Sequence, residues 1–244
     1  MDIKTVKKLS IIVPCYNEEA ALEPIIEEVL AIDIGKTAKE IIIVDDKSSD
    51  DSFRIAEKLA RKHPEIKTIF QERNTGKGAA LKRGFIESTG DLVIVQDADR
   101  EYDPRDYNLL LQIFREDRAD IVFGSRFSGG APRRVVYLAN TIANKLMTRL
   151  SALLSGLYVS DIHTCYIMFD GDWIRSKAPK LRSKRFGFNP EIVAKIAREK
   201  ENLRICETSI SYYGRTKAEG KKIGVKDGLK AIWEIIYFNL LGRN

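Results

Sequence analysis

The fold of this chain is decided by the stretch Leu92-Val93-Ile94-Val95-Gln96-Asp97-Ala98-Asp99-Arg100-Glu101. Its apolar first part predicts a short buried strand, and the acidic residues follow where that strand ends. On an extended chain Asp97, Asp99 and Glu101 share one face, and in a turn they can converge on one point. Converging carboxylates repel one another unless a cation lies between them, and Mg²⁺ or Mn²⁺ prefers such ligands. The stretch therefore predicts a metal site, with a solvated acidic loop as the alternative.

Strands and helices alternate around this stretch, up to about residue 125. Apolar runs predict further strands at 9–14, 40–44, 68–70 and 119–124, and helical spacing predicts helices at 18–31, 52–62, 78–88 and 104–116. Because the strands are almost continuously apolar, we expect a parallel sheet covered on both faces. Ligands bind at the carboxyl ends of such strands. We therefore expect Asp45, Asp46, Asp97 and Asp99 to line one cleft.

The pattern changes after residue 125. We expect a long helix at 137–158, strands at 165–169 and 203–212, helices at 190–200 and 226–241, and a mobile loop at 213–224. The 137–158 segment has leucines on one side and Lys145 and Arg149 on the other. It is predicted either to pack in the core or to lie on a membrane surface.

Composition and charge narrow the function classes. Hydrophobic residues make up 44% of the chain and charged residues 31%, which is typical of a soluble globular protein. Residues 172–244 hold 17 Lys and Arg against 8 Asp and Glu, so an anionic partner is expected there, with a solvated basic surface as the alternative. Three isolated cysteines indicate neither a zinc site nor a disulfide framework and fit a reducing cytosol. No apolar run reaches the roughly 20 residues that span a bilayer.

A glycine-rich element precedes the predicted helix at 78–88. Asn74-Thr75-Gly76-Lys77-Gly78 places two glycines around a lysine, which predicts an anion site at the helix start or, alternatively, a simple helix entry. The P-loop pattern is absent, and no dinucleotide fingerprint follows the first strand. A nicotinamide-binding protein therefore loses its main support.

Taken in order, these segments resemble glycosyltransferase family 2, the inverting GT-A group, and most closely its polyprenyl-phosphate (dolichyl-phosphate) mannosyl- and glucosyltransferase branch. The matching segments are 13–19, 44–46, 74–80, 97–104, 124–127, 186–191, 213–216 and 219–223. The resemblance implies a Rossmann-like GT-A α/β fold, with a mixed, mostly parallel sheet flanked by helices. It also implies one domain over 1–244, with a nucleotide-sugar half at 1–125 and an acceptor half at 126–244 that carries the basic C-terminal segment.

The implied activity is a metal-dependent transfer of one hexose, with inversion, from a nucleotide diphosphate sugar to a polyprenyl phosphate. GDP-mannose and UDP-glucose are both expected as possible donors. The enzyme would be cytoplasmic and peripheral at the cytoplasmic face of the membrane. Because a lipid phosphate is already ionised near neutral pH, a strong general base is less necessary than for a sugar hydroxyl.

The resemblance also implies residue roles. Pro14, Tyr16, Glu18 and Asp46 would contact the nucleoside side of the donor, and Asp97, Asp99 and Glu101 would surround Mg²⁺ or Mn²⁺. The phosphates would meet Lys77, Arg126, Arg215, Lys221 and Lys222. Asp97, Asp99 and Arg126 would serve catalysis, and Asp161 is the next candidate if a base is needed. Arg133 and Arg134 could meet an acceptor phosphate.

Three places depart from the family pattern, and at one of them Asp51-Ser52 stands where Gly-Thr is usual. Lys47 stands where glycine is usual, beside the expected nucleobase pocket, and Ile167 stands where a basic residue is common. The Q-x-x-R-W signature of processive synthases is absent, so polymer synthesis is not expected. Two alternatives are a family 2 transferase with a saccharide or protein hydroxyl acceptor and, more remotely, a nucleic-acid-binding protein. The late aromatic residues form no recognisable nucleic-acid motif, so no nucleic acid partner is expected.

Overall fold

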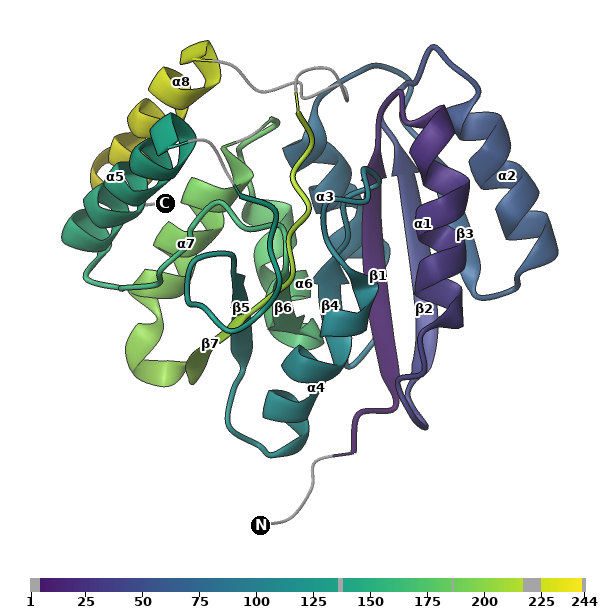
Figure 1. Ribbon diagram of the computed structural model, residues 1–244, viewed down its shortest axis with the longest axis horizontal. Helices are drawn as coiled ribbons and strands as arrows, with labels where there is room; N and C mark the ends of the chain where they lie inside the picture. The colour runs from purple at the N-terminus through teal and green to yellow at the C-terminus, as the bar shows by residue number, and fades with distance from the viewer. Residues whose placement is uncertain (1–4, 136–137, 186, 217–224, 243–244) are drawn as a thin grey trace.

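The computed structural model describes residues 5–135, 138–185, 187–216 and 225–242 (Figure 1). Within these residues seven strands form one sheet in the order β3-β2-β1-β4-β6-β5-β7. Their bounds are β1 Lys8–Cys15, β2 Ala38–Asp45, β3 Ile66–Phe70, β4 Leu92–Val95, β5 Ile121–Ser125, β6 Ile167–Asp170 and β7 Ile205–Ser209. All neighbours pair in parallel except β6, which runs antiparallel to β4 and β5. The predicted mixed, mostly parallel sheet is confirmed.

Helices cover the faces of this sheet, and some of them lie together beyond one of its ends (Figure 1). They are α1 Glu19–Ala31, α2 Ser52–Lys62, α3 Lys77–Glu87, α4 Tyr107–Arg115, α5 Leu138–Ser155, α6 Gly171–Lys177, α7 Phe188–Arg198 and α8 Val225–Ile236. Short helical turns stand at Pro104–Asp106, Ala178–Lys180, Lys200–Asn202 and Tyr237–Leu241. In Figure 1, α5, α7 and α8 lie together at the left end, opposite α1 and α2, whereas α3 packs on β1 and β2.

The strands that carry the acidic residues are buried on both faces, as their sequence predicts. Ile11, Ile12, Val93 and Ile94 are fully buried, because helices cover both sides of the parallel part of the sheet. Since β1, β2 and β4 are parallel neighbours, their carboxyl ends meet at one edge. The segments that follow them therefore come together in space. The predicted mobile loop at 213–224 lies outside the described residues from 217 onward.

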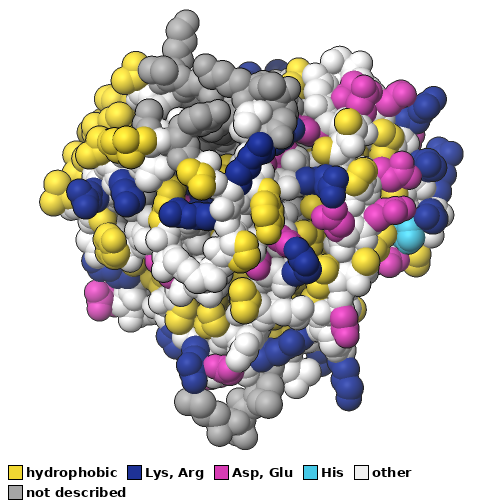
Figure 2. Space-filling model, viewed as in Figure 1, with side chains coloured by type: hydrophobic (Ala, Val, Ile, Leu, Met, Phe, Trp, Pro, Cys, Tyr) yellow, Lys and Arg dark blue, Asp and Glu magenta, His cyan; other side chains and the backbone are white. Residues whose placement is uncertain are grey.

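Helices α5 and α8 leave an apolar surface uncovered. This surface, called the α5–α8 face here, is formed by Leu138, Ile142, Leu146, Leu153, Leu229, Trp233, Leu240 and Leu241, all of which are exposed. The inner side of α5 packs on α7 and α8, where Ser151 is fully buried, so the helix both packs and presents leucines outward. Hydrophobic side chains gather over these helices at the upper left of Figure 2, with Lys and Arg below them. No helix in the described part of the chain is long and apolar enough to cross a bilayer.

Candidate active site

The carboxylates predicted from the opening stretch lie among cationic side chains. The Asp97 Oδ1 atom is 2.5 Å from Lys77 Nζ, which projects from the first residue of α3. Burial works against the charge of Lys77, but Asp97 outweighs that effect and raises the pKa of the ammonium group. The pair therefore joins the end of β4 to the start of α3.

Arg215 holds a second group of carboxylates together. Its guanidinium lies 3.1 Å from Glu18 Oε2 and 3.2 Å from Asp99 Oδ2, and its backbone N–H donates to Glu101 Oε1 at 2.6 Å. Glu18 follows β1, Asp99 follows β4 and Arg215 follows β7, so three distant segments meet at one cation. The structure thus brings together Glu18, Asp99, Glu101 and Arg215, all of which are candidate site residues from the sequence.

The acidic cluster carries more negative than positive charge. Burial raises the pKa of Asp99 to about 7, and the charges of Asp97 and Glu101 add to this effect despite the nearby Arg215. When ionised, the carboxylates of Glu18, Asp97, Asp99 and Glu101 exceed the cations Lys77 and Arg215 by two charges. A divalent cation matches that excess in charge and in its preference for oxygen ligands. Among the described residues, however, no three acidic, histidine or cysteine side chains are already grouped as a metal cage. A metal would therefore have to share Asp97 and Asp99 with Lys77 and Arg215, or replace these cations.

Glu101 uses both of its carboxylate oxygens on the segment after β7. Oε1 accepts the Arg215 N–H at 2.6 Å, and Oε2 accepts the Tyr212 hydroxyl at 2.9 Å. These bonds make Glu101 an anchor for the segment that delivers Arg215. A metal at Glu101 would compete with these bonds, as a metal at Asp99 would compete with the bonds that Asp99 accepts from the Glu101 N–H and from Arg215.

Arg126 and Asp161 form a buried bidentate pair. Arg126 Nε lies 2.6 Å from Asp161 Oδ2 and Nη2 lies 2.8 Å from Oδ1, and the Asp161 residue is fully buried. Burial alone would raise the pKa of Asp161, but Arg126 outweighs it and lowers that pKa below its usual value. The Arg126 guanidinium also lies 5.0 Å from the ring centre of Tyr212. This geometry argues against Asp161 as a general base. Both of its oxygens accept hydrogen bonds from Arg126, and its lowered pKa makes the carboxylate a poor proton acceptor.

Asp46 shapes the loop that leads into α3. Its carboxylate accepts the Gly76 N–H at 2.7 Å and the Thr75 N–H at 2.8 Å. Neighbouring Asp45 is equally buried, and among the described residues its Oδ2 atom has no hydrogen-bond partner. The sequence identifies this pair of aspartates as candidates, but it does not show which of the two has a carboxylate oxygen without a hydrogen-bond partner.

The start of α3 does not form the anion site predicted from its glycines. The Gly78 N–H donates to the Arg185 carbonyl at 3.2 Å, and the Ala79 N–H donates to the Lys184 carbonyl at 3.1 Å. A Cβ atom at Gly78 would lie 2.5 Å from the Ser183 carbonyl oxygen. The glycines therefore allow a second segment to approach, and its carbonyls take the amides that an anion would need. This is a correction of the sequence-based prediction.

The remaining predicted residues have different surroundings. Pro14 is half-buried and Tyr16 is exposed in the loop after β1, near the half-buried Glu18. Lys47 has a φ of +63°, a conformation that favours glycine, and its Nζ lies 4.9 Å from the ring centre of Phe70. Lys221 and Lys222 lie outside the described residues.

Two further polar residues lie next to predicted site residues: the His163 N–H donates to Asp161 Oδ1 at 3.2 Å, and Gln96 directly precedes Asp97. Burial lowers the pKa of His163 to about 4, so this side chain is neutral near physiological pH. The buried Gln96 was missed as a supporting residue. Its Oε1 accepts the hydroxyls of Tyr107 and Tyr166 at 2.7 and 2.5 Å, and its Nε2 donates to the Asp97 carbonyl at 3.0 Å. Its position directly before Asp97 in the sequence is the signal that could have indicated this supporting role.

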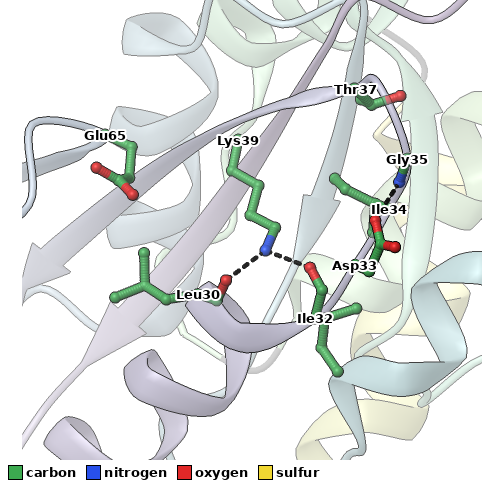
Figure 3. Close-up of a pocket in the computed structure, with 8 residues that line it drawn as sticks. All are labelled: Leu30, Ile32, Asp33, Ile34, Gly35, Thr37, Lys39 and Glu65. Carbon is green, nitrogen blue, oxygen red and sulfur yellow. Dashed lines mark hydrogen bonds between the residues drawn. The ribbon is translucent and has the colours of Figure 1, made fainter.

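A hollow of about 330 Å³ lies at the opposite edge of the sheet, near the start of β2 (Figure 3). There the Lys39 ammonium donates to the carbonyls of Leu30, at 2.6 Å, and Ile32. These carbonyls belong to the C-terminal end of α1, where a positive charge stabilises the helix. The hollow therefore surrounds the capped C-terminal end of α1. The candidate active-site residues lie at the other edge of the sheet.

Comparison with known proteins decides the family. The family model described as Glycosyl transferase family 2 matches residues 10–175. The chain belongs to this family. It is therefore a glycosyltransferase, as its sequence predicted.

Relatives and solved structures agree with this assignment. The chain is 29% identical over 229 residues to the dolichyl-phosphate β-glucosyltransferase of Dictyostelium discoideum, covering 88% of this chain and 68% of that protein. It is 25% identical over 250 residues to the UDP-N-acetylglucosamine–dolichyl-phosphate N-acetylglucosaminyltransferase of Methanococcus voltae, covering 96% and 97%. The crystal structure of glucosyl-3-phosphoglycerate synthase from Mycobacterium tuberculosis with Mn²⁺, UDP and glucosyl-3-phosphoglycerate superposes with a TM-score of 0.70 at 18% identity, covering 96% of this chain and 80% of that one. The predicted GT-A fold is confirmed.

Proposed function

We propose that this family 2 glycosyltransferase moves one hexose from a nucleotide diphosphate sugar to a polyprenyl phosphate at a membrane surface, with Mg²⁺ or Mn²⁺. The observation that carries the proposal is the acidic cluster at the carboxyl edge of the sheet, which in its ionised form has two negative charges more than its own cations. The relatives named for dolichyl phosphate support the acceptor class. GDP-mannose and UDP-glucose are the donors to test first. The expected location is the cytoplasmic face of the membrane.

The donor would bind over residues 1–125. A divalent cation held by Asp97 and Asp99 would neutralise the diphosphate as the glycosidic bond breaks. Lys77 and Arg215, which already lie against these carboxylates, are placed to turn to the phosphate oxygens. Asp45 is the better candidate for a nucleoside contact, because Asp46 spends its oxygens on the loop before α3.

The acceptor would bind over residues 126–244. Asp161 holds Arg126 through Nε and Nη2 of its guanidinium, so Nη1 is the nitrogen that would meet an acceptor phosphate. Arg133 lies close by, since its Nη1 donates to the Arg126 carbonyl at 2.9 Å. An ionised phosphate acceptor attacks without a base, in keeping with the positioning role of Asp161. Lys221 and Lys222 remain predicted phosphate contacts.

Metal removal tests this proposal. We expect release of nucleoside diphosphate from GDP-mannose or UDP-glucose only when polyprenyl phosphate and Mn²⁺ or Mg²⁺ are both present. EDTA should abolish the release, and added Mn²⁺ should restore it, because the uncompensated carboxylates would otherwise repel the diphosphate. A full rate in EDTA, measured with a coupled nucleotide assay, would refute the metal requirement. Failure of every donor would refute the transfer itself.

The α5–α8 face is the proposed membrane contact. Exposed leucines beside Trp233, with Lys and Arg nearby, are typical of helices that lie in a lipid interface. A lipid acceptor has to be drawn from a bilayer, which favours a lipid surface as the occupant of this face.

Charge placed on this face should release the protein from vesicles. The double variant Leu146→Glu and Trp233→Glu should lose flotation with anionic liposomes, because both side chains are more than half exposed on the α5–α8 face. Its activity on a short water-soluble polyprenyl phosphate should remain. The matched control is Leu109→Glu, which changes an exposed leucine on α4 and should float normally. Equal flotation of the double variant and the control would rule out this contact.

A further inference from the structure

A short strap, defined as residues 182–185, lies across the first turn of α3. The carbonyls of Lys184 and Arg185 accept the N–H groups of Ala79 and Gly78 at 3.1 and 3.2 Å. The contact is close, because a Cβ atom at Gly76 would lie 2.5 Å from the Lys184 carbonyl oxygen. The strap thus fixes the turn from which Lys77 projects.

One buried carboxylate holds the strap from the other side. Glu191, on α7, is 1% exposed. Its Oε1 and Oε2 atoms lie 2.9 and 3.0 Å from the Arg182 nitrogen, and Oε2 lies 2.7 Å from the Ser183 nitrogen. A charged acceptor of this kind makes strong, directional bonds to backbone amides. Within the described residues it forms one ion pair, with Lys195 at 3.7 Å, so the amides of the strap are the closer partners of its carboxylate.

A continuous set of contacts therefore links Glu191 to the acidic cluster. It runs from the Glu191 carboxylate through the strap to the first turn of α3, and then from Lys77 Nζ to Asp97 Oδ1 at 2.5 Å. We propose that Glu191 is a positioning residue for the donor site: it sets Lys77 against Asp97 and so sets the affinity for the metal and the nucleotide diphosphate. This inference rests on the proposed function and adds a residue remote from the reacting atoms.

Glutamine at position 191 tests the role with little change in volume. Its single carbonyl oxygen can accept an amide of the strap, but its NH₂ group would face another N–H. We expect Glu191→Gln to weaken binding of UDP or GDP with Mn²⁺ about tenfold, measured by isothermal titration calorimetry. In a Lys77→Gln background the same change should alter affinity less than about twofold, because the two residues act through one contact.

The control is Glu40→Gln, a half-buried carboxylate near the opposite edge that accepts the Thr89 N–H at 2.8 Å. It should change thermal stability and leave nucleotide affinity unchanged in both backgrounds. If Glu191→Gln does not fold, Gly78→Ala displaces the strap from its other side and should show the same coupling to Lys77→Gln. Unchanged affinity, or independent effects of the two substitutions, would overturn the positioning role while the proposed function stands. A wild-type protein that binds neither UDP nor GDP would overturn both.

Discussion

Asp99→Asn should abolish sugar transfer while leaving the protein folded. We expect kcat to fall by at least about 10³-fold, because the substitution removes a ligand charge from the group that neutralises the leaving diphosphate. The melting temperature should stay the same or rise, since Asp99 is buried beside Asp97 and Glu101, and their negative charges disfavour its ionised form. Steady-state kinetics with a saturating donor and differential scanning calorimetry measure the two effects.

Asp103→Asn is the matched control for this substitution. Asp103 lies four residues further along the same loop, and its carboxylate pairs with Arg105 outside the acidic cluster. Its replacement should leave kcat within about threefold of wild type. Near-normal turnover of Asp99→Asn, or an equal loss in Asp103→Asn, would contradict the role given to Asp99.

The second large effect is expected at Asp161, and it concerns stability. Asp161→Asn leaves the Arg126 guanidinium buried without its counter-charge, which costs about 3–5 kcal/mol of unfolding free energy. For a chain of this size the melting temperature should fall by about 10 °C. Transfer should fall as well, because Arg126 loses the pair that orients it.

The chain supplies an exposed pair of the same geometry as a control. Asp120 accepts Arg204 Nη2 at 2.7 Å and Nε at 3.1 Å, but the Arg204 side chain is 46% exposed. Asp120→Asn should therefore cost about 1 kcal/mol or less. Chemical denaturation of both variants makes the comparison. Equal costs would show that the burial of the Arg126–Asp161 pair contributes nothing.

Local sequence signals were enough to predict most of the strands and helices, though not α6, and the edge of the sheet at which the candidate site lies. Apolar runs predicted the strands. Asp97 and Asp99 were predicted as site residues because they follow directly after β4. Both signals can be found in a few consecutive residues. A strand of a parallel sheet that is covered on both faces has to be apolar throughout, and the residues directly after it lie at the ligand-binding edge.

The sequence could not reveal which distant groups meet at that edge. Asp99 and Arg215 are 116 positions apart, and the strap contacts Gly78 across a similar distance along the chain. The glycines at the start of α3 left an anion site and a simple helix entry open, and neither alternative included the close approach of a second segment, which only tertiary packing reveals. Asp161 was a candidate base for a similar reason: its partner Arg126 lies 35 residues earlier.

Product analysis with a lipid-phosphate acceptor tests the central claim most directly. The protein, Mn²⁺, GDP-mannose or UDP-glucose and a short polyprenyl phosphate would be incubated, and the lipid fraction examined by mass spectrometry and NMR. The account predicts one hexose in a β-linked phosphodiester to the lipid, formed in equal amount with the nucleoside diphosphate. Transfer of the hexose to a saccharide or protein hydroxyl instead, with no lipid-linked product, would contradict it.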